Sequence, residues 1–225
     1  MEMEKLYPES KVEVTGFMAR YYDIGLDIAT FGRYLPFMKE VVHMTGIEPE
    51  DRILDLGTGT GRNACLMAEY LSEKGELVGV DISNEMIARF RKRCADSPNV
   101  RVANMRIDRS LPYRNRFTKV FISFVLHGFP QNVRILIILN AFRALKYGGK
   151  LLILDYNEFL PSKLPFYLRI PFKKLECPHA FDFIERDWKR ILAGVGFNGF
   201  EEHFYIHQSV RLMMATKLND LEYQQ

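Results

Sequence analysis

Short apolar runs alternate with helical patterns along residues 52–155, and this alternation restricts the chain to a small set of folds. The apolar runs fall at about 52–56, 76–81, 99–103, 118–124 and 149–155, with helical patterns at about 61–73, 84–94 and 132–145. Runs such as KVFISFVL and KLLILDY contain few polar residues, which is typical of strands covered on both faces of a parallel sheet. We therefore predict a doubly wound α/β fold, in which Gly148-Gly149 caps the last of these helices.

The C-terminal part of the chain departs from the alternation. The helical pattern WKRILAGVGF is followed by GFEEHFYIHQ and VRLMMATK, two strand patterns with no helix between them. Two consecutive strands joined by a short connection predict an antiparallel hairpin. This hairpin would complete a mostly parallel sheet of seven strands.

Two further segments flank or interrupt this domain. Residues 1–50 mix aromatic residues with helical spacing that breaks near Gly25, Gly32 and Pro36. We interpret them as an N-terminal helical cap on a domain of residues 51–225. Residues from about 156 to 185 contain four prolines and form an irregular stretch, which we interpret as a lid-like insert.

Cysteine usage and hydropathy indicate in which cellular compartment the protein resides. No apolar run reaches the roughly 18 residues that a membrane-spanning helix needs, and the polar N-terminus is unlike a secretory signal. Cys65, Cys94 and Cys177 are widely spaced and form no CxxC pair. We therefore expect free thiols in a reducing compartment, with neither a disulfide framework nor a zinc site, and predict a cytoplasmic protein.

The charge is unevenly distributed, although the net charge is only +3. Between positions 89 and 119 the only acidic residues are Asp96 and Asp108. The same stretch contains ten basic residues: Arg89, Arg91, Lys92, Arg93, Arg101, Arg106, Arg109, Arg114, Arg116 and Lys119. A weaker basic stretch, SKLPFYLRIPFKK, covers residues 162–174. Such clusters can contact nucleic acid or lipid headgroups, or can simply be solvated helix faces and loops, and both interpretations stay open.

A glycine-rich turn follows the first strand pattern, in ILDLGTGTGR. Glycines at positions 57, 59 and 61 allow a ligand to approach the backbone closely. The dinucleotide pattern GxGxxG requires a glycine where Arg62 stands, and the phosphate-binding pattern GxxxxGK[ST] lacks its Lys-Ser/Thr pair after Gly61. The turn therefore favours a ligand without a pyrophosphate.

Asp81 adds a second constraint, because it ends the next strand pattern, twenty residues after Gly61. A carboxylate at this place can accept two hydrogen bonds from the vicinal hydroxyls of a ribose. Its alternative role is the N-cap of the following helix, for which Ser83 is better placed. A ligand with a ribose and no pyrophosphate, such as an adenosyl group on an amino-acid tail, meets both conditions.

On these motifs the chain resembles the class I S-adenosylmethionine-dependent methyltransferases. ILDLGTGTG matches their first motif, VGVDIS their second, and ALKYGGKLLILDY their usual run into the fifth strand. Within that superfamily, ARYYD, ANM, LPY and FISFVLHGFP make the chain most similar to the branch that methylates ubiquinone and menaquinone precursors. The resemblance covers roughly residues 20–155 and the closing hairpin.

The resemblance implies S-adenosylmethionine as cofactor and a small, hydrophobic aromatic or quinone-like molecule as methyl acceptor. Two alternatives remain: an RNA methyltransferase that uses the Arg-rich 89–119 surface, and a non-catalytic regulator that binds the cofactor. The residues that the resemblance assigns to the cofactor are Tyr22, Asp55, Gly57, Thr58, Gly59, Thr60, Gly61, Asp81, Ile82, Met86, Asn104, Met105 and Ser123.

Among these residues, the resemblance implies that Asp55, Gly57 and Gly59 face the methionine part of the cofactor. Thr60 and Gly61 would line the same turn.

The nucleoside part would contact Asp81 at the ribose and Met86 at the adenine. Asn104-Met105 stands where related enzymes meet the adenine amino group, and an Asn side chain can both accept from an exocyclic amine and donate to a ring nitrogen. Asp108 is a rival for this contact.

Three residues complete the implied site. Ser123 would close the pocket near the sulfonium, and Tyr22 would cover the cofactor or act as a plain core aromatic. His127, at the mouth of the fourth strand, is the candidate general base for an acceptor that must lose a proton; a hydrogen-bonded loop histidine is the alternative.

His203 and His207 share one strand face, but we expect no metal there because a third ligand is missing. The segment NEFLPSKLPFYLRIPFKK suits a hydrophobic acceptor taken from a membrane surface, where its Lys and Arg residues would meet headgroups. A mobile lid packed on its own aromatics is the alternative. Nucleic acid is the less favoured partner, because no base-stacking motif is evident.

Overall fold

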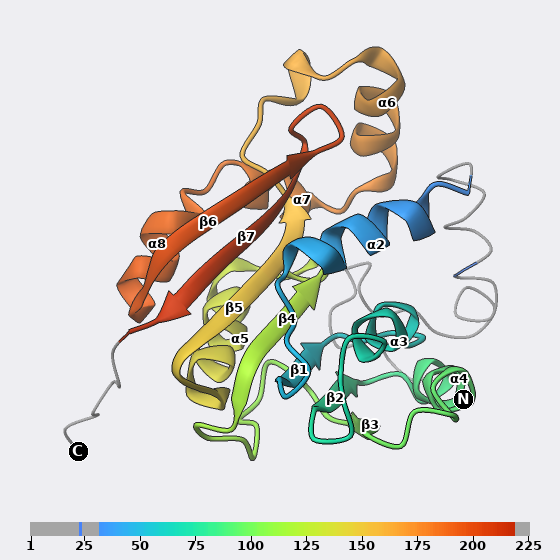
Figure 1. The fold of residues 1–225 in the computed structure, drawn as a ribbon. Helices are drawn as coiled ribbons and strands as arrows, with labels where there is room; N and C mark the ends of the chain where they lie inside the picture. Colours follow the sequence, from blue (N-terminus) through green and yellow to red (C-terminus); the bar gives the residue numbers. More distant parts are fainter. Residues whose placement is uncertain (1–22, 24–31, 219–225) are drawn as a thin grey trace, which may run out of the picture.

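A single seven-stranded sheet organises the structure, a computed structural model that describes residue 23 and residues 32–218 (Figure 1). Its strands are β1 (Arg52–Leu56), β2 (Glu76–Asp81), β3 (Val100–Asn104), β4 (Phe117–Ser123), β5 (Leu145–Tyr156), β6 (Phe197–Tyr205) and β7 (Val210–Lys217), in the order 3-2-1-4-5-7-6. Strands β1 to β5 pair in parallel, whereas β7 lies antiparallel to both β5 and β6. The predicted fold class and the closing hairpin are confirmed.

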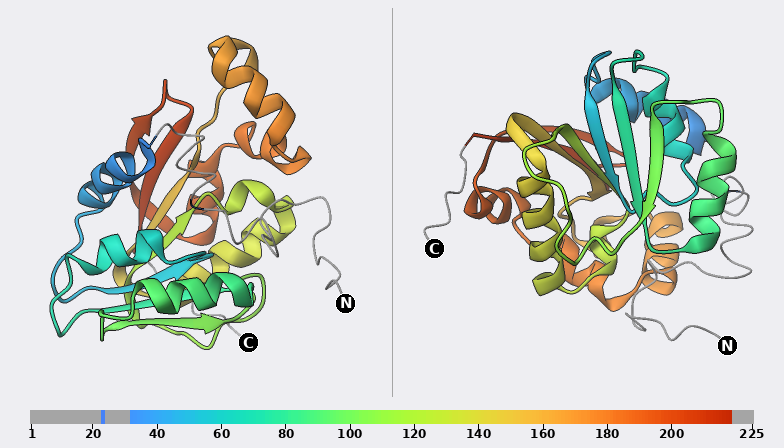
Figure 2. Two further views of the ribbon diagram at one scale, coloured as in Figure 1. Left: turned by 90° about the vertical axis from the view of Figure 1, so that its right-hand side faces the viewer. Right: turned by 90° about the horizontal axis from the view of Figure 1, so that it is seen from below.

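Helices cover both faces of this sheet (Figure 2). They are α2 (Tyr34–Met44), α3 (Arg62–Ala68), α4 (Asn84–Arg93), α5 (Gln131–Ala144), α6 (Phe166–Leu175), α7 (Pro178–Ile184) and α8 (Trp188–Val195), with short 3-10 turns η1 (Leu126–Gly128) and η2 (Pro161–Lys163). Side chains of α2, α3 and α4 share one hydrophobic core, and those of α5, α7 and α8 share another. No helix in the described part of the chain is long and apolar enough to span a bilayer.

Successive strand residues belong to opposite cores, which explains why the strands are apolar throughout. Ile53 packs with α2, α3 and α4, whereas its neighbour Leu54 packs with the helices on the other face. The same alternation holds for Phe121 and Ile122 in β4. A strand buried on both faces has no solvent side on which polar residues would be favourable.

The glycine pair at 148–149 does not cap α5, contrary to the sequence-based expectation. The helix ends at Ala144, and Leu145 passes directly into β5 with extended torsion angles (φ −70°, ψ 140°). The glycines instead lie where the β4–β5 register shifts, between the pairs Phe117–Leu145 and Lys119–Lys150. Gly148 has φ +75° there, so its left-handed backbone accommodates the register shift within the strand.

The proline positions were also misinterpreted. Pro36 does not break a helix but lies in the first turn of α2, where a missing N–H costs nothing. The 156–185 insert is largely helical, and its prolines are compatible with helices. Pro161 and Pro178 stand at the starts of η2 and α7, and Pro165 is the N-cap of α6. Gly25 and most of the proposed N-terminal cap lie outside the described residues.

Cys65 and Cys94 form a disulfide, which contradicts the expectation of free thiols. Cys65 belongs to α3 and Cys94 follows the last residue of α4, and packing of the two helices brings their Cα atoms to 5.8 Å. Cys177 is a buried free cysteine. Because the bridge depends on helix packing, the sequence spacing carried no signal for it, and thiol usage no longer indicates a reducing compartment.

Candidate functional site

The glycine turn joins β1 to α3 at the carboxyl edge of the sheet. Gly57, Gly59 and Gly61 have φ angles of +77°, +57° and +79°. A Cβ atom on Gly57 would lie 2.6 Å from Val125, and one on Gly61 would lie 2.6 Å from Phe90. A Cβ on Gly59 would meet nothing within 4 Å. The outer two glycines therefore allow close packing, while the middle one leaves open space above the backbone.

Two carboxylates frame this open space. The buried Asp55 accepts a hydrogen bond from the Thr58 hydroxyl at 2.5 Å. Asp81 accepts hydrogen bonds from the backbone N–H groups of Gly59 (2.8 Å) and Ser83 (2.9 Å), so it ties the turn to the end of β2. Ser83 is the N-cap of α4, as predicted, but Asp81 is not free of protein contacts. Each of its oxygens retains a lone pair for a ligand.

The electrostatics of the two carboxylates favour a positively charged ligand. Burial raises the pKa of Asp55 to about 7; the Thr58 hydrogen bond opposes this shift, and the charge of Asp81 adds to it. Burial also raises the pKa of Asp81, against the effect of its backbone hydrogen bonds. A cation nearby would relieve both carboxylates, whereas a phosphate would be repelled. A sulfonium compound with an adenosyl group therefore fits the residues present.

The carboxyl ends of β2 and β3 come together beside Asp81. The Asn104 side chain donates hydrogen bonds to the Ile82 carbonyl at 3.1 Å and to the Asn84 side chain at 2.9 Å. The Met105 N–H donates to the Asp81 carbonyl at 3.1 Å. Ile82 is exposed although it is large and apolar. This edge therefore offers an apolar surface and an amide close to the carboxylate.

The two remaining adenine candidates are placed differently. Asp108 is held by Arg106 through two hydrogen bonds of 3.0 and 2.6 Å. Met86 is a buried residue in the first turn of α4. The structure thus brings Asn104, rather than Asp108, next to Ile82.

Thr60 is occupied by contacts within the protein. Its hydroxyl donates to Asp23 at 2.9 Å and accepts from Arg93 at 2.7 Å, and Arg93 also pairs with Asp23 at 2.7 Å. The network joins the glycine turn to the N-terminal segment. Tyr22, its neighbour in the sequence, lies outside the described residues.

Ser123 ends β4 next to the start of α3. The Asn63 side chain donates to its hydroxyl at 3.4 Å, and the Tyr34 hydroxyl donates to Asn63 at 3.0 Å. Asn63 and Tyr34 were not identified from the sequence. Asn63 lies at this edge because α3 starts directly after the glycine turn, and Tyr34, the first residue of α2, contacts it through its hydrogen bond to Asn63.

His127 forms a close pair with a carboxylate. It lies in η1, just after β4, and its Nδ1 is 2.7 Å from Oδ1 of Asp155, near the end of β5. The His127 backbone N–H also donates to Asp155, at 3.2 Å. A proton on Nδ1 is therefore held by the carboxylate, which leaves Nε2 as the basic atom. Glu176, directly after α6, lies 3.7 Å from Nε2.

The pKa of His127 is raised above its ordinary value of 6.5. Burial lowers this pKa, but the charge and the hydrogen bond of Asp155 raise it, with a further contribution from Glu176. A histidine with such a pKa can accept a proton near neutral pH and stay ion-paired afterwards.

The Tyr156 ring packs against His127, and further aromatic rings pack against Tyr156. The Tyr156 ring centroid lies 5.0 Å from that of His127, and the Phe172 ring lies 5.1 Å from Tyr156. Phe124 packs edge-on against Tyr156 at 6.3 Å and has φ +52°, a strained angle for a residue with a side chain. The Tyr156 hydroxyl donates to Glu176 at 2.7 Å. Aromatic rings therefore pack around Tyr156 next to His127, and the Glu176 carboxylate lies on the Nε2 side of the histidine.

Arg134 holds the turn that carries His127. Its fully buried side chain donates to the carbonyls of Leu126 (3.0 Å), His127 (3.3 Å) and His179 (2.5 Å). These bonds join η1 to α7 and fix the position of the histidine backbone.

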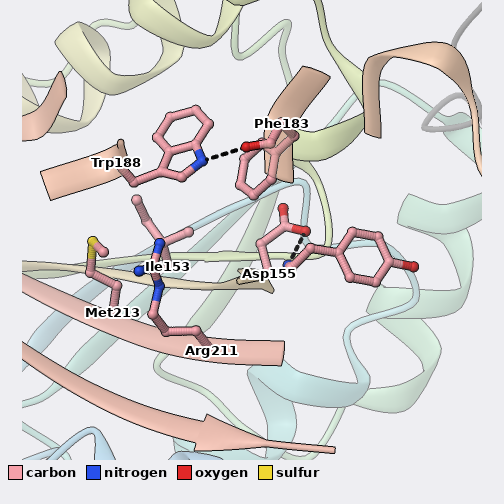
Figure 3. Close-up of a pocket in the computed structure, with 7 residues that line it drawn as sticks. Ile153, Asp155, Phe183, Trp188, Arg211 and Met213 are labelled. Carbon is pink, nitrogen blue, oxygen red and sulfur yellow. Dashed lines mark hydrogen bonds between the residues drawn. The ribbon is translucent and has the colours of Figure 1, made fainter. Parts of the chain in front are cut away.

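Asp155 also lines a small cavity (Figure 3). The remaining lining residues are Ile153, Tyr156, Phe183, Trp188, Arg211 and Met213. With a volume of about 10 Å³, the cavity is too small for any methyl acceptor.

Asp155 and Glu176 were missed at the sequence level. Asp155 had a signal, because it ends the apolar run KLLILDY at the carboxyl edge where ligands bind. Glu176 had none, because its approach to His127 depends on the folding of the insert.

One prediction concerns the open space over Gly59. Gly59→Ala and Gly148→Ala replace glycines of positive φ whose added Cβ would meet nothing within 4 Å. Each should lose roughly 1–2 kcal/mol of unfolding free energy in denaturant titrations, since both force Ala into the left-handed region. Only Gly59→Ala should also weaken S-adenosylmethionine binding several-fold in calorimetry. Equal affinities for the two variants would mean that no ligand approaches Gly59.

Comparisons with known proteins indicate the class of protein. A family model described as a methyltransferase domain matches residues 53–149. The chain is 30% identical over 204 residues to the ubiquinone/menaquinone biosynthesis C-methyltransferase UbiE of Yersinia pestis, covering 89% of this chain and 75% of that protein. The enzyme of the same name from Wigglesworthia glossinidia brevipalpis is 32% identical over 143 residues, covering 61% of this chain and 55% of the relative.

Among solved structures, a S-adenosylmethionine-dependent methyltransferase from Aquifex aeolicus superimposes with a TM-score of 0.60 at 18% identity, covering 80% of this chain and 89% of that one. This likeness supports the Rossmann-like methyltransferase fold. The chain belongs to the class I S-adenosylmethionine-dependent methyltransferases. Its cofactor is S-adenosylmethionine and its acceptor is a small molecule, and its resemblance to the UbiE enzymes is distant.

Proposed function

We propose that the enzyme methylates a hydrophobic aromatic or quinone-like acceptor, with His127 as the general base. The observation that supports this most is the His127–Asp155 pair, 2.7 Å apart, with Tyr156 packed against His127 and Phe172 packed against Tyr156. The names of the relatives point to the same class of acceptor. They share about 30% of their residues with this chain, so they support the class and no particular compound.

The chemistry requires placement and one proton transfer. S-adenosylmethionine supplies a methyl group that is already activated by a positive sulfur. A phenol or quinol held in line with this methyl gains an effective molarity that lowers the barrier by roughly 7–11 kcal/mol. The acceptor proton would pass to Nε2 of His127, and Asp155 would stabilise the imidazolium. The acceptor oxygen or carbon would form its bond to the methyl group as the bond from that methyl to sulfur breaks, so that neutral S-adenosylhomocysteine leaves.

For the cofactor we propose that Asp81 binds the ribose hydroxyls and that Asn104, Ile82 and Met105 meet the adenine. Asp55 and the Gly57–Gly61 turn would hold the methionine part, with Ser123 nearby. The support is the arrangement of these groups around the open space over Gly59.

The RNA alternative has less support, because several cations of the 89–119 stretch are already paired. Arg93 pairs with Asp23, Arg106 with Asp108 and Arg116 with Glu76. Lys119 is buried, and its Nζ lies 2.7 Å from Asp51.

A cytoplasmic location also stays a proposal, since the Cys65–Cys94 disulfide removes the argument from free thiols for it.

A labelled-cofactor screen tests the acceptor class. Quinols, simple phenols and RNA are each incubated with the enzyme and radiolabelled S-adenosylmethionine, and transfer to quinols or phenols is expected. Transfer to RNA alone would overturn the proposal. Binding of the cofactor without transfer to any acceptor would favour the non-catalytic regulator.

The pH dependence of kcat/KM gives a further prediction. A general base must be neutral, and the pKa of His127 lies above 6.5, so activity should rise with pH and reach a plateau only above that raised value. In Asp155→Asn the inflection should move to lower pH, because the charge that raises the pKa of His127 is gone. An inflection that Asp155→Asn leaves in place would assign the titration to another group.

A further inference from the structure

Helix α6 turns an apolar face to the solvent. Phe166, Tyr167 and Ile170 are 68%, 53% and 50% exposed, and Leu160 precedes them as another exposed apolar residue. At 100° per residue, these three α6 residues share an arc of roughly 120° with Lys173 and Lys174. Surface helices normally bury their apolar stripe, so an outward one marks an interaction surface.

The charge of this segment is of one sign. Residues 159–175 contain Lys163, Arg169, Lys173 and Lys174 and no acidic residue. The three lysines are exposed and make no ion pair with any residue in the described part of the chain. Exposed aromatic and aliphatic residues flanked by unpaired lysines are complementary to an anionic lipid surface, into which the rings insert while the cations meet headgroups.

The tip of the β6–β7 hairpin extends the surface, because it lies beside α6 (Figure 1). The Tyr167 hydroxyl is 3.0 Å from Nε2 of His207 in this turn. Ile206, next to it, is exposed and has φ +48°, an unfavourable angle for a β-branched residue. The apolar face thus spans two segments that are far apart in the sequence.

The inner side of α6 forms a wall of the His127 site. Phe172 is buried and packs against Tyr156, Phe159 and Phe181 with ring centroids 5.1, 5.3 and 5.1 Å away. Glu176, which contacts Tyr156, directly follows the helix. One helix therefore separates the exposed apolar face from the aromatic site.

We propose that Leu160, Phe166, Tyr167, Ile170 and Ile206, with the lysines of α6 and η2, dock the enzyme on an anionic bilayer. A hydrophobic acceptor would enter the site from that bilayer past α6. The docking rests on exposure and charge alone, whereas the route of the acceptor rests on the proposed function.

Co-sedimentation of the full-length protein with vesicles tests the docking. Vesicles of phosphatidylcholine with phosphatidylglycerol should bind the wild type, those of phosphatidylcholine alone should bind it weakly, and high salt should weaken binding. Phe166→Ser/Ile170→Ser should lower partitioning at least about tenfold, and Lys173→Gln/Lys174→Gln roughly 30-fold, since each lysine near the surface contributes about 1 kcal/mol.

Matched controls come from the other end of β5. Tyr147 is 67% exposed and Lys146 is exposed beside it. Tyr147→Ser and Lys146→Gln remove the same kinds of side chain and should leave vesicle binding unchanged. Circular dichroism and cofactor affinity of all variants establish that they are folded.

Several outcomes would overturn the docking surface. One is vesicle binding by both double variants that is as strong as that of the wild type. Another is a loss of vesicle binding in the control variants that equals the loss in the α6 variants. A third is concentration-dependent self-association that the α6 variants abolish in the absence of vesicle binding, because the face would then contact a second copy. Vesicle binding without methyl transfer to any quinol would support docking and contradict the proposed acceptor.

Discussion

His127→Ala is expected to lower kcat by roughly 100- to 10 000-fold, the usual contribution of a general base, while the Kd for S-adenosylmethionine stays nearly constant. The ring contacts Asp155 and the aromatic side chains, and no cofactor candidate described above depends on it. Stopped assays at saturating cofactor give kcat, and calorimetry gives the Kd. An acceptor that needs no deprotonation would make the loss small.

Asp155→Asn serves as the companion variant. It keeps an oxygen that can accept the Nδ1 proton but removes the charge that stabilises the imidazolium, so an intermediate loss is expected. A similar drop of turnover and cofactor affinity in His127→Ala would show that the histidine supports the fold of the site instead.

Asp81→Ala is expected to weaken S-adenosylmethionine binding more than tenfold. Charge-assisted hydrogen bonds contribute roughly 1.5–3 kcal/mol, which corresponds to about 10- to 150-fold in Kd. The carboxylate also binds the Gly59 N–H at 2.8 Å, so its removal releases the turn as well. Titration calorimetry measures the loss, and an unchanged Kd would remove Asp81 from the cofactor site.

A 2′-deoxyribose analogue of the cofactor product separates the two effects. If Asp81 binds the ribose hydroxyls, the wild type should prefer the ribose form and Asp81→Ala should have lost most of that preference. A preference that survives the substitution would mean that Asp81 acts only through the turn.

The fold was predictable because its signals are local. Apolar strands such as the one ending at Asp55 and Leu56 must be covered on both faces, and a glycine turn after the first strand defines the edge where ligands bind. Asp81 could be placed for the same reason, since it ends the neighbouring strand. These features need only the strand periodicity and the topology of a parallel sheet.

The features that were missed depend on contacts between distant segments. Cys65 and Cys94 meet only because α3 packs beside α4, and Glu176 reaches His127 only because the insert folds into helices. The prolines of that insert suggested irregularity, yet Pro161 and Pro178 begin helices. Composition could not distinguish a proline that interrupts regular structure from one that stands at the start of a helix.

The bridge between Cys65 and Cys94 has a practical consequence for work on this enzyme. Both residues contact the Gly61 carbonyl, through the Cys65 N–H at 2.9 Å and the Cys94 sulfur at 3.8 Å. A dithiol added to a purification buffer would therefore reduce a disulfide next to the glycine turn, for which we propose contact with the methionine part of the cofactor. Affinities recorded with and without such a reagent describe two chemically different proteins, and each value needs its oxidation state stated beside it.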